Sequence, residues 1–373
     1  MSAAQHTVGV GEYWGVGHRH GFLPAAAAAV PRSSPFADAD ELLRALPVLS
    51  DRELVRRVRG LPAIDPESVD ALDAPQLEGA LRAYSFLAHR LIHRGLLDAE
   101  RALHAGVAQP FWVLSKALSR PPGLTYAAYV LTNFDGEVPH RQPPETIAVA
   151  RTFTGSPDEA WLIAVGLALE SIGGDIVRGL EECSIALDGA EPAGVDEGLG
   201  RIAAALEWAA SVLPRIRERV DPAVFAESVG PLLAGFDAVR FAGLPGSPAL
   251  SYSGEAAAQS GALQAADAGL GIDHDQGTTR SLDLYAACAP RPHRAFMGWA
   301  KSVGAALTAH VAHEPAARRS YRLAADALAR VREAQVSLVD NHLSSRDRPA
   351  AGGAPPHAWL RRLAADSREA AAA

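Results

Sequence analysis

Histidines are the residues of this chain whose type and spacing could support metal chemistry. Three pairs lie close together in the sequence: His18/His20, His89/His93 and His310/His313. The i,i+4 spacing of the second pair would place both imidazoles on one face of a helix, where they could share a metal ion. No glutamate completes an HExxH zinc motif at any pair. Two interpretations of each pair therefore stay open: a weak metal site, or ordinary histidines of the surface or core.

A further histidine, His342, lies at the end of the longest predicted helix. Tyr321, Leu328, Val331 and Leu338 recur before it at helical spacing, which places His342 on or near the core-facing stripe. An imidazole that points into an apolar interior is what a five-coordinate heme iron requires as its axial ligand. From position alone, the commoner alternative of a hydrogen-bonded core histidine stays open.

Several separated segments resemble the indoleamine 2,3-dioxygenase superfamily. Residues 121–134 (PPGLTYAAYVLTNF) resemble the family segment PPxLxYAxxVLxNW, and residues 253–260 (SGEAAAQS) resemble GGSAxQSS. Four shorter likenesses occur in the family's order: 221–225 with 235–236 to NPxxFF…SGW, 290–296 to PPxHRxF, 337–343 to SLRSYHL, and 352–353 to TGGT. The resemblance runs from about residue 105 to the end of the chain. It implies the family fold more strongly than it implies one reaction.

The resemblance implies a heme b cofactor, O2 as co-substrate, and His342 as the axial ligand to the iron. Asp267 falls where the family has a proximal aspartate, which could orient the axial imidazole. Ala257 and Gly166 would border the cofactor. The resemblance places a third group of residues around the substrate: Tyr126, Tyr129, Val130, Leu162, Phe225, Gly230, Ala256 and Gly352.

Three positions depart from the family pattern. Gly230 stands where the family has an arginine that clamps the tryptophan carboxylate, and losing such a bond costs roughly 2 kcal/mol or more. Gly166 replaces a distal polar residue, and Val339 replaces an arginine one turn before the axial histidine. We therefore expect a modified tryptophan, or a carboxylate held by another residue such as Arg240. The chain is similar in these respects to bacterial natural-product members, such as the maremycin-pathway tryptophan oxygenase.

The elements that must position these residues are predicted to be helices. Period-2 alternation of β-branched residues is nearly absent, whereas apolar residues recur at helical spacing over most of the chain. The predicted fold class is all-α, with a small N-terminal helical domain at 1–104 and a larger heme-binding domain at 105–373. The main predicted helices begin and end near these residues: 42–46, 77–91, 161–180, 199–220, 222–236, 257–270, 293–310, 316–343 and 357–371.

Composition excludes several classes of protein. A net charge of −8 without a basic tract argues against nucleic-acid binding. The apolar run Ala25–Val30 is too short to span a bilayer, and the N-terminus lacks the pattern of a signal peptide. Cys183 and Cys288 lie far apart without a CxxC motif, which indicates two reduced buried thiols. We therefore expect a cytoplasmic monomer or homodimer that does not bind membranes.

The expected reaction is oxygenation of the indole ring at C2 and C3. The cofactor would carry the chemistry, while the protein excludes water and fixes the indole beside the bound oxygen. Insertion of both oxygen atoms cleaves the ring, and insertion of one gives a 2-oxindole. A non-catalytic heme sensor or carrier is a further alternative.

Overall fold

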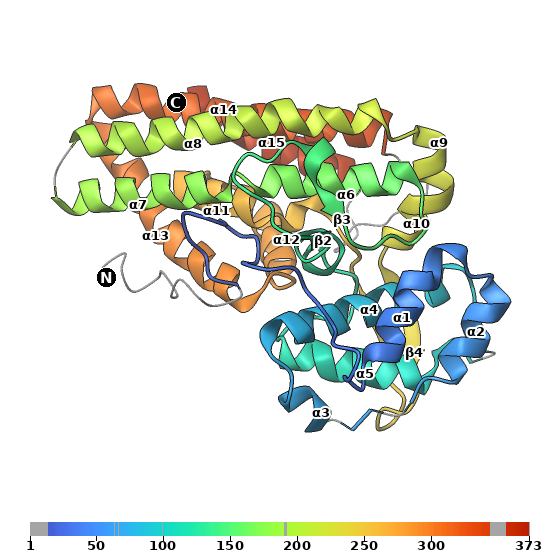
Figure 1. Cartoon of the computed structure of the whole chain (residues 1–373). Helices are drawn as coiled ribbons and strands as arrows, with labels where there is room; N and C mark the ends of the chain where they lie inside the picture. Colours follow the sequence, from blue (N-terminus) through green and yellow to red (C-terminus); the bar gives the residue numbers. More distant parts are fainter. Residues whose placement is uncertain are drawn as a thin grey trace.

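The computed structural model describes residues 14–343 and 356–372, apart from residues 63, 66, 99, 190 and 191. It is mostly helical, which confirms the predicted fold class. Figure 1 shows a bundle of helices with a smaller group of helices beside it. An extended N-terminal arm, residues 14–30, runs between the two parts.

The smaller group is built from the N-terminal part of the chain: α1 (Ala37–Ala45), α2 (Asp51–Arg59), α3 (Glu67–Asp70), α4 (Ala74–His93) and α5 (Ala105–Ala117), with a 3-10 turn η2 (Leu46–Val48). Ser50 caps α2 and Asp73 caps α4, because each side chain accepts a hydrogen bond from the backbone N–H three residues later. α4 is the central helix of this group and is buried over most of its length.

Short strands connect this group to the rest of the chain. β1 (Ala102–Leu103) pairs in parallel with β4 (Phe236–Phe241), which pairs antiparallel with β5 (Ala249–Tyr252). A second small sheet joins β2 (Phe134–Asp135) to β3 (Ala148–Val149). Because β4 pairs with β1 and packs against α5, contacts cross the domain boundary expected at residue 104, and that boundary stays a prediction (Figure 1).

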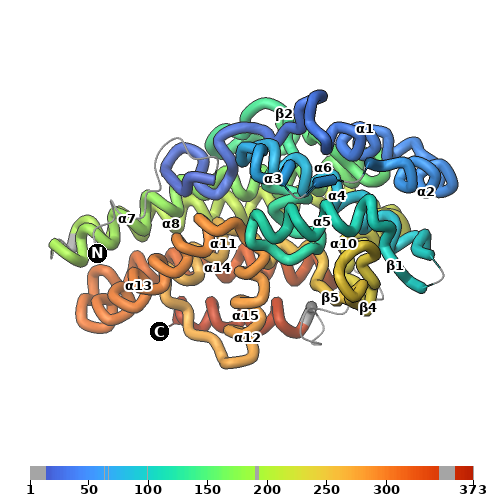
Figure 2. The backbone as a smooth tube through the Cα atoms, turned by 90° about the horizontal axis from the view of Figure 1, so that it is seen from below, coloured from blue at the N-terminus to red at the C-terminus, as the bar shows by residue number. Residues whose placement is uncertain are grey.

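The bundle contains the long helices α6 (Pro157–Glu170), α7 (Gly173–Gly189), α8 (Pro192–Val212), α13 (Arg291–His313), α14 (Pro315–Asn341) and α15 (Pro356–Ala372), with the shorter α11 (Gly261–Leu270) and α12 (Gln276–Ala286). α8 lies between α7 and α14, and α15 packs along α14. Figure 2 shows the same order from below, with α11 against α13. The long apolar faces predicted from sequence therefore meet in one core.

The single helix predicted over residues 161–180 is wrong, because the chain breaks at Ser171 and Ile172 between α6 and α7. The N-terminal arm packs against the start of α7, directly after this break. A Cβ atom at Gly174 would lie 2.2 Å from the carbonyl oxygen of His18, so only glycine allows the arm to approach the start of α7. The close approach at Gly174 is therefore made by the chain's own backbone.

The helix predicted over residues 199–220 is confirmed up to Val212, the end of α8, whereas short helical turns replace the rest of it and the helix predicted over 222–236. They are η5 (Leu213–Glu218), α9 (Pro222–Val224), the π-helical turn η6 (Phe225–Val229) and α10 (Gly230–Leu233). Similar turns occur at η3 (Ala127–Leu131, π-helical), η4 (Pro144–Thr146) and η7 (Ala257–Gln259). π-Helical turns are rare and occur frequently at functional sites.

One stretch of the described residues, Pro157–Gly189, passes a length and composition test for a membrane span. It comprises α6 and α7, and 78% of its most apolar window is buried inside the fold. Core helices of globular proteins pass the same test, so this stretch is accounted for by packing.

Candidate functional site

His342 lies directly after α14, where it meets the residues that precede α9. Its Nε2 atom lies 2.5 Å from the carbonyl oxygen of Val220, and the side chain is half-buried. An imidazole that donates its Nε2–H to a carbonyl keeps a lone pair on Nδ1. Such an outer hydrogen bond orients most metal-bound histidines. The donor set at His342 therefore fits an axial ligand.

The same loop links His342 to α6. The backbone N–H of Asp221 donates to Oδ1 of Asp158 in the first turn of α6, at 2.7 Å. Leu162 and Gly166 follow Asp158 at four-residue intervals, and within the fully described run Trp161–Glu170 only these two keep partial exposure. Two apolar positions of α6 are therefore only partly covered, on the helix that the Asp221 loop contacts, and a flat apolar cofactor such as heme would fit against them.

Tyr126 and Val130 border Gly166 from the η3 segment. A Cβ atom at Gly166 would lie 3.0 Å from Cγ1 of Val130 and 3.4 Å from the hydroxyl oxygen of Tyr126. The Tyr126 hydroxyl donates to the Gly166 carbonyl at 3.4 Å. The structure thus brings these three predicted residues together. It places a phenol hydroxyl beside the position where the sequence lacks the distal polar side chain.

Tyr129, predicted to contact substrate, belongs to the aromatic core. Its ring stacks on Phe153 and on Phe86, with centroid distances of 6.2 and 5.8 Å. Its hydroxyl lies 3.4 Å from Oε1 of the buried Glu159. The ring and the hydroxyl are both used in packing, so Tyr126 and Phe225 are left as the aromatic residues of the predicted wall.

Phe225 fills the space beside Gly230. A Cβ atom at Gly230 would lie 3.0 Å from Cε1 of Phe225 and 3.1 Å from its carbonyl oxygen. Arg240, suggested as a substitute carboxylate clamp, is exposed on β4, whereas its neighbours Val239 and Phe241 are buried. Its guanidinium donates to the Ser247 carbonyl at 3.4 Å. This arrangement does not support the suggestion that Arg240 replaces the missing arginine.

The segment 254–259 closes the site from another side. Oε1 of Gln259 accepts a hydrogen bond from the backbone N–H of Tyr126 at 2.8 Å, and its Nε2 donates to the Gly254 carbonyl at 3.0 Å. Ala256 is half-buried and Ala257 exposed, so both have surface free for a ligand. Gly352 lies outside the described residues.

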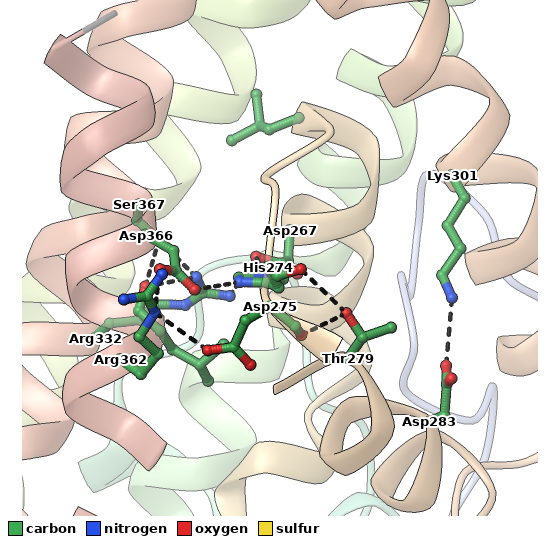
Figure 3. A network of polar contacts seen from close by, with 12 residues as sticks. Asp267, His274, Asp275, Thr279, Asp283, Lys301, Arg332, Arg362, Asp366 and Ser367 are labelled. Carbon is green, nitrogen blue, oxygen red and sulfur yellow. Dashed lines mark hydrogen bonds and ion pairs between the residues drawn. The ribbon is translucent and has the colours of Figure 1, made fainter. Parts of the chain in front are cut away.

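Asp267 belongs to a buried ionic network rather than contacting His342 (Figure 3). Its carboxylate pairs with Arg332 of α14 and lies 3.0 Å from Nε2 of His274, whose Nδ1 lies 2.7 Å from Asp366 of α15. Burial opposes ionisation of Asp267, but these two cationic partners lower its pKa. Since Arg332 lies roughly three turns before His342, Asp267 would act on the proximal side by holding α14.

Hydrogen bonds to the backbone account for the His89/His93 pair. Nδ1 of His89 lies 3.1 Å from the Leu232 carbonyl, and its Nε2 accepts the backbone N–H of Leu124 at 2.8 Å. Nε2 of His93 lies 2.9 Å from the Ala234 carbonyl. Both nitrogens of His89 are occupied, so a shared metal site here is not supported.

Cys183 and Cys288 are free, buried thiols, as predicted. Burial raises the pKa of Cys183 to about 12 and that of Cys288 to about 11, so neither provides a thiolate ligand at neutral pH. Among the described residues, no group of three or more His, Cys, Asp or Glu side chains could hold a metal ion.

Two acidic residues near Tyr126 were missed by sequence reasoning. Glu170, the last residue of α6, is fully buried, and its carboxylate accepts hydrogen bonds from Ser260 and from the backbone N–H of Ala262. Burial raises the pKa of Glu170 to about 7. Glu255 occupies the second glycine position of the GGSAxQSS pattern, and this departure was readable in the sequence.

Comparisons with a family model and with individual proteins assign the chain to the same family. A family model described as indoleamine 2,3-dioxygenase matches residues 11–369. The chain is 28% identical over 319 residues to indoleamine 2,3-dioxygenase of Saccharomyces cerevisiae, covering 78% of this chain and 70% of the relative. The chain is 25% identical to mouse indoleamine 2,3-dioxygenase 1, and the match covers 83% of this chain and 79% of the relative. It is also 25% identical to 6-hydroxytryptophan 2,3-dioxygenase of Fusarium equiseti, and that match covers 89% of this chain and 84% of the relative. None of these three descriptions names a maremycin-type enzyme. The chain belongs to the indoleamine 2,3-dioxygenase family of heme-dependent enzymes that act on tryptophan and related indoles.

Proposed function

We propose that this chain binds heme b through His342 and uses O2 to oxidise C2 and C3 of an indole substrate. The observation that carries the proposal is that neighbouring residues of one loop, Val220 and Asp221, contact His342 and the start of α6, the helix on which Leu162 and Gly166 are only partly covered. Family membership supports the same cofactor and co-substrate.

When bound, heme would supply the iron at which O2 reacts with the electron-rich indole C2–C3 bond. The chain's own residues would hold and shield the reactants. His342 would hold the iron through its imidazole, and the Val220 carbonyl, 2.5 Å from Nε2, positions the ring in the structure. Buried Tyr126 and Phe225 would exclude water and restrict the orientation of the indole, which lowers the entropic part of the barrier.

Two outcomes of the reaction are distinguished within the proposal. The three relatives are named 2,3-dioxygenases, which supports insertion of both oxygen atoms with ring cleavage. Gly166 itself contributes no hydroxyl to the distal side, where the phenol hydroxyl of Tyr126 lies beside it. That departure favours a natural-product role on a modified tryptophan, in which one oxygen atom would give a 2-oxindole. We propose ring cleavage as the main reaction and oxindole formation as its alternative.

Reaction under 18O2 tests the proposal. The purified heme-loaded protein would be reduced under argon and mixed with L-tryptophan, 6-hydroxytryptophan or tryptamine before 18O2 is added. Mass spectrometry would then count the 18O atoms in each product. Two labels in one product support dioxygenation, and one label supports the monooxygenase alternative. A normal heme spectrum without turnover of any indole would indicate a carrier and contradict the proposed activity.

A further inference from the structure

The N-terminal arm is attached to both helical parts of the molecule by aromatic side chains. Trp14 donates its indole N–H to Oε1 of Glu78 on α4 at 2.6 Å, and the other oxygen of that carboxylate pairs with the buried guanidinium of Arg120. The fully buried Phe22 packs on the bundle, where a Cβ atom at Gly261, the first residue of α11, would lie 2.7 Å from its ring. Residues 14–22 therefore form a strap between α4 and the start of α11.

Both aromatic side chains of this strap contact one histidine of α13. The His293 ring lies edge-on to the rings of Trp14 and Phe22, with centroid distances of 5.1 and 5.2 Å and interplanar angles of 90° and 86°. His293 is 1% exposed, and neither of its ring nitrogens hydrogen-bonds to any residue that the structure describes. A neutral imidazole is favoured in such surroundings, because a protonated ring would bury a charge and two N–H donors without an acceptor.

The charged groups around His293 also oppose its protonation. Burial is the main cause that lowers the pKa of His293 to about 3, and the guanidinium groups of Arg120 and Arg294 lower it further. The Glu78 carboxylate could offset a positive charge, but it is already paired with Arg120. Cys288, which both arginines influence, has a pKa of about 11 and is a neutral thiol. A positive ring at this position would therefore be unstable while the strap covers it.

Other titratable groups along the strap act in both directions. Nε2 of His18 lies 2.5 Å from Oε2 of Glu181 on α7, so protonation of His18 would favour docking of the strap. Burial lowers the pKa of His20, so its protonation would oppose docking. Glu170 accepts the hydroxyl of Ser260 at the start of α11, and its raised pKa of about 7 makes acid stabilising there. The effect of His293 is therefore separable from these groups only by substitution.

We propose that residues 14–22 are a proton-released strap, in which protonation of His293 displaces Trp14 and Phe22 from α13 and uncovers the start of α11. In the docked state the ring is neutral, whereas release lets it reach water, where its pKa returns toward 6.5. Docking is therefore complete above about pH 6.5 and weakens by up to about tenfold for each pH unit below it, until about pH 3. This inference concerns the fold and does not depend on the proposed reaction.

Hydrogen exchange of the purified full-length protein tests the proposal. Mass spectrometry would follow residues 14–30 between about pH 7.5 and 5, with correction for the intrinsic exchange rate at each pH. We expect the opening equilibrium of the arm to increase about thirtyfold over this range, and exchange at the start of α11 to rise with it. His293→Phe keeps a planar ring against Trp14 and Phe22 but cannot be protonated. It should remove the pH dependence and protect the arm more strongly at every pH, because no unpartnered nitrogen stays buried.

His20→Gln is the matched control, because burial shifts this second arm histidine in the same direction, and the variant should keep most of the pH dependence. Unchanged exchange of the wild-type arm over the whole pH range would overturn the inference, even if a variant failed to fold. A His293→Phe variant with the wild-type dependence would also overturn it, as would loss of the dependence in His20→Gln. An equal increase at the centre of α14 would show that the whole fold opens together, which contradicts a local strap.

Discussion

Nε2 of His342 and the carbonyl oxygen of Val220 lie 2.5 Å apart, across the junction between the end of α14 and the start of α9. This contact fixes the imidazole from the side away from its second nitrogen. It also connects the proposed ligand to the loop that Asp221 ties to Asp158 of α6. The two walls proposed to hold the cofactor are therefore positioned by neighbouring residues of one loop.

Replacement of His342 should abolish stable cofactor binding. His342→Ala leaves no imidazole at this position, so the purified variant should contain less than about a tenth of the wild-type heme, since coordination supplies most of the specific attachment. The heme-to-protein ratio and the Soret band measure this. His313→Ala, on the exposed end of α13, is the matched control and should retain heme. A wild-type Soret band in His342→Ala would show that another group holds the iron.

Gly230→Arg should restore affinity for free tryptophan. The new guanidinium would supply one charge-assisted bond to the carboxylate, which corresponds to roughly a tenfold lower Kd. The side chain must displace Phe225, so we expect unfolding stability to fall by about 1 kcal/mol. Gly230→Gln introduces similar bulk without charge and should lose stability without gaining affinity. Equal tryptophan binding by both variants would exclude a charge effect.

The network around Asp267 should matter mainly for stability. Asp267→Ala leaves Arg332 and His274 buried without their shared carboxylate, and such a loss costs about 3–5 kcal/mol. Urea unfolding measures the cost, and a redox titration of the heme-loaded protein detects movement of α14. Asp283→Ala, which removes the exposed pair with Lys301 in Figure 3, should change stability by less than about 1 kcal/mol. Equal costs for the two variants would contradict a structural role for the network.

The raised pKa of the buried Glu170 carboxyl group predicts that the protein loses stability as pH rises. Its folded pKa is about 7, above the ordinary value of 4.5, because burial disfavours the carboxylate. A raised folded pKa means that the stabilising contribution is complete below pH 4.5 and is lost as pH rises through about 7. The difference of about 2.5 units corresponds to a loss on the order of 3 kcal/mol. Glu170→Gln should flatten the dependence between pH 5 and 8, and an unchanged slope would assign it to another group.

Two glycines in the bundle should respond oppositely to alanine. At Gly174 a Cβ atom would lie 2.2 Å from the His18 carbonyl, so Gly174→Ala should destabilise the protein by about 1–3 kcal/mol and make the N-terminal arm more susceptible to proteolysis. At Gly200, on α8, a Cβ atom meets nothing within 4 Å. Gly200→Ala should therefore stabilise the protein by about 0.5–1 kcal/mol. Chemical denaturation of both variants measures the difference, and a destabilised Gly200→Ala would contradict the argument from free space.

Local pattern predicts the long helices of this chain well, because α4, α13 and α14 keep a continuous apolar stripe. It fails where distant residues decide the outcome. The start of α7 lies against the N-terminal arm, and β4 is paired with β1 and β5, which come from distant parts of the sequence or from the other side of a turn. The pairing of Asp267 with Arg332 is likewise invisible in sequence.

Some residues of the candidate site could likewise be predicted from the sequence, whereas the roles of others are seen only in the structure. Gly166 and Gly230 stood out because they depart from a motif, whereas Tyr129 could be placed in the core only from its stacking on Phe153. His342 was predicted as the ligand from helical position and motif together. The structure adds its Val220 hydrogen bond, which no spacing rule indicates.

The packing of the N-terminal arm has a consequence for synthesis on the ribosome. Phe22 is fully buried, and its ring lies 5.5 Å from the ring of Phe296 in α13. The arm leaves the ribosome before α13, so its docking surface is completed only at a later stage of synthesis. Until then Phe22 remains exposed to solvent or to a chaperone, because the residues that cover it have not yet emerged. Docking of the arm is thus a late folding step that closes a loop spanning most of the polypeptide.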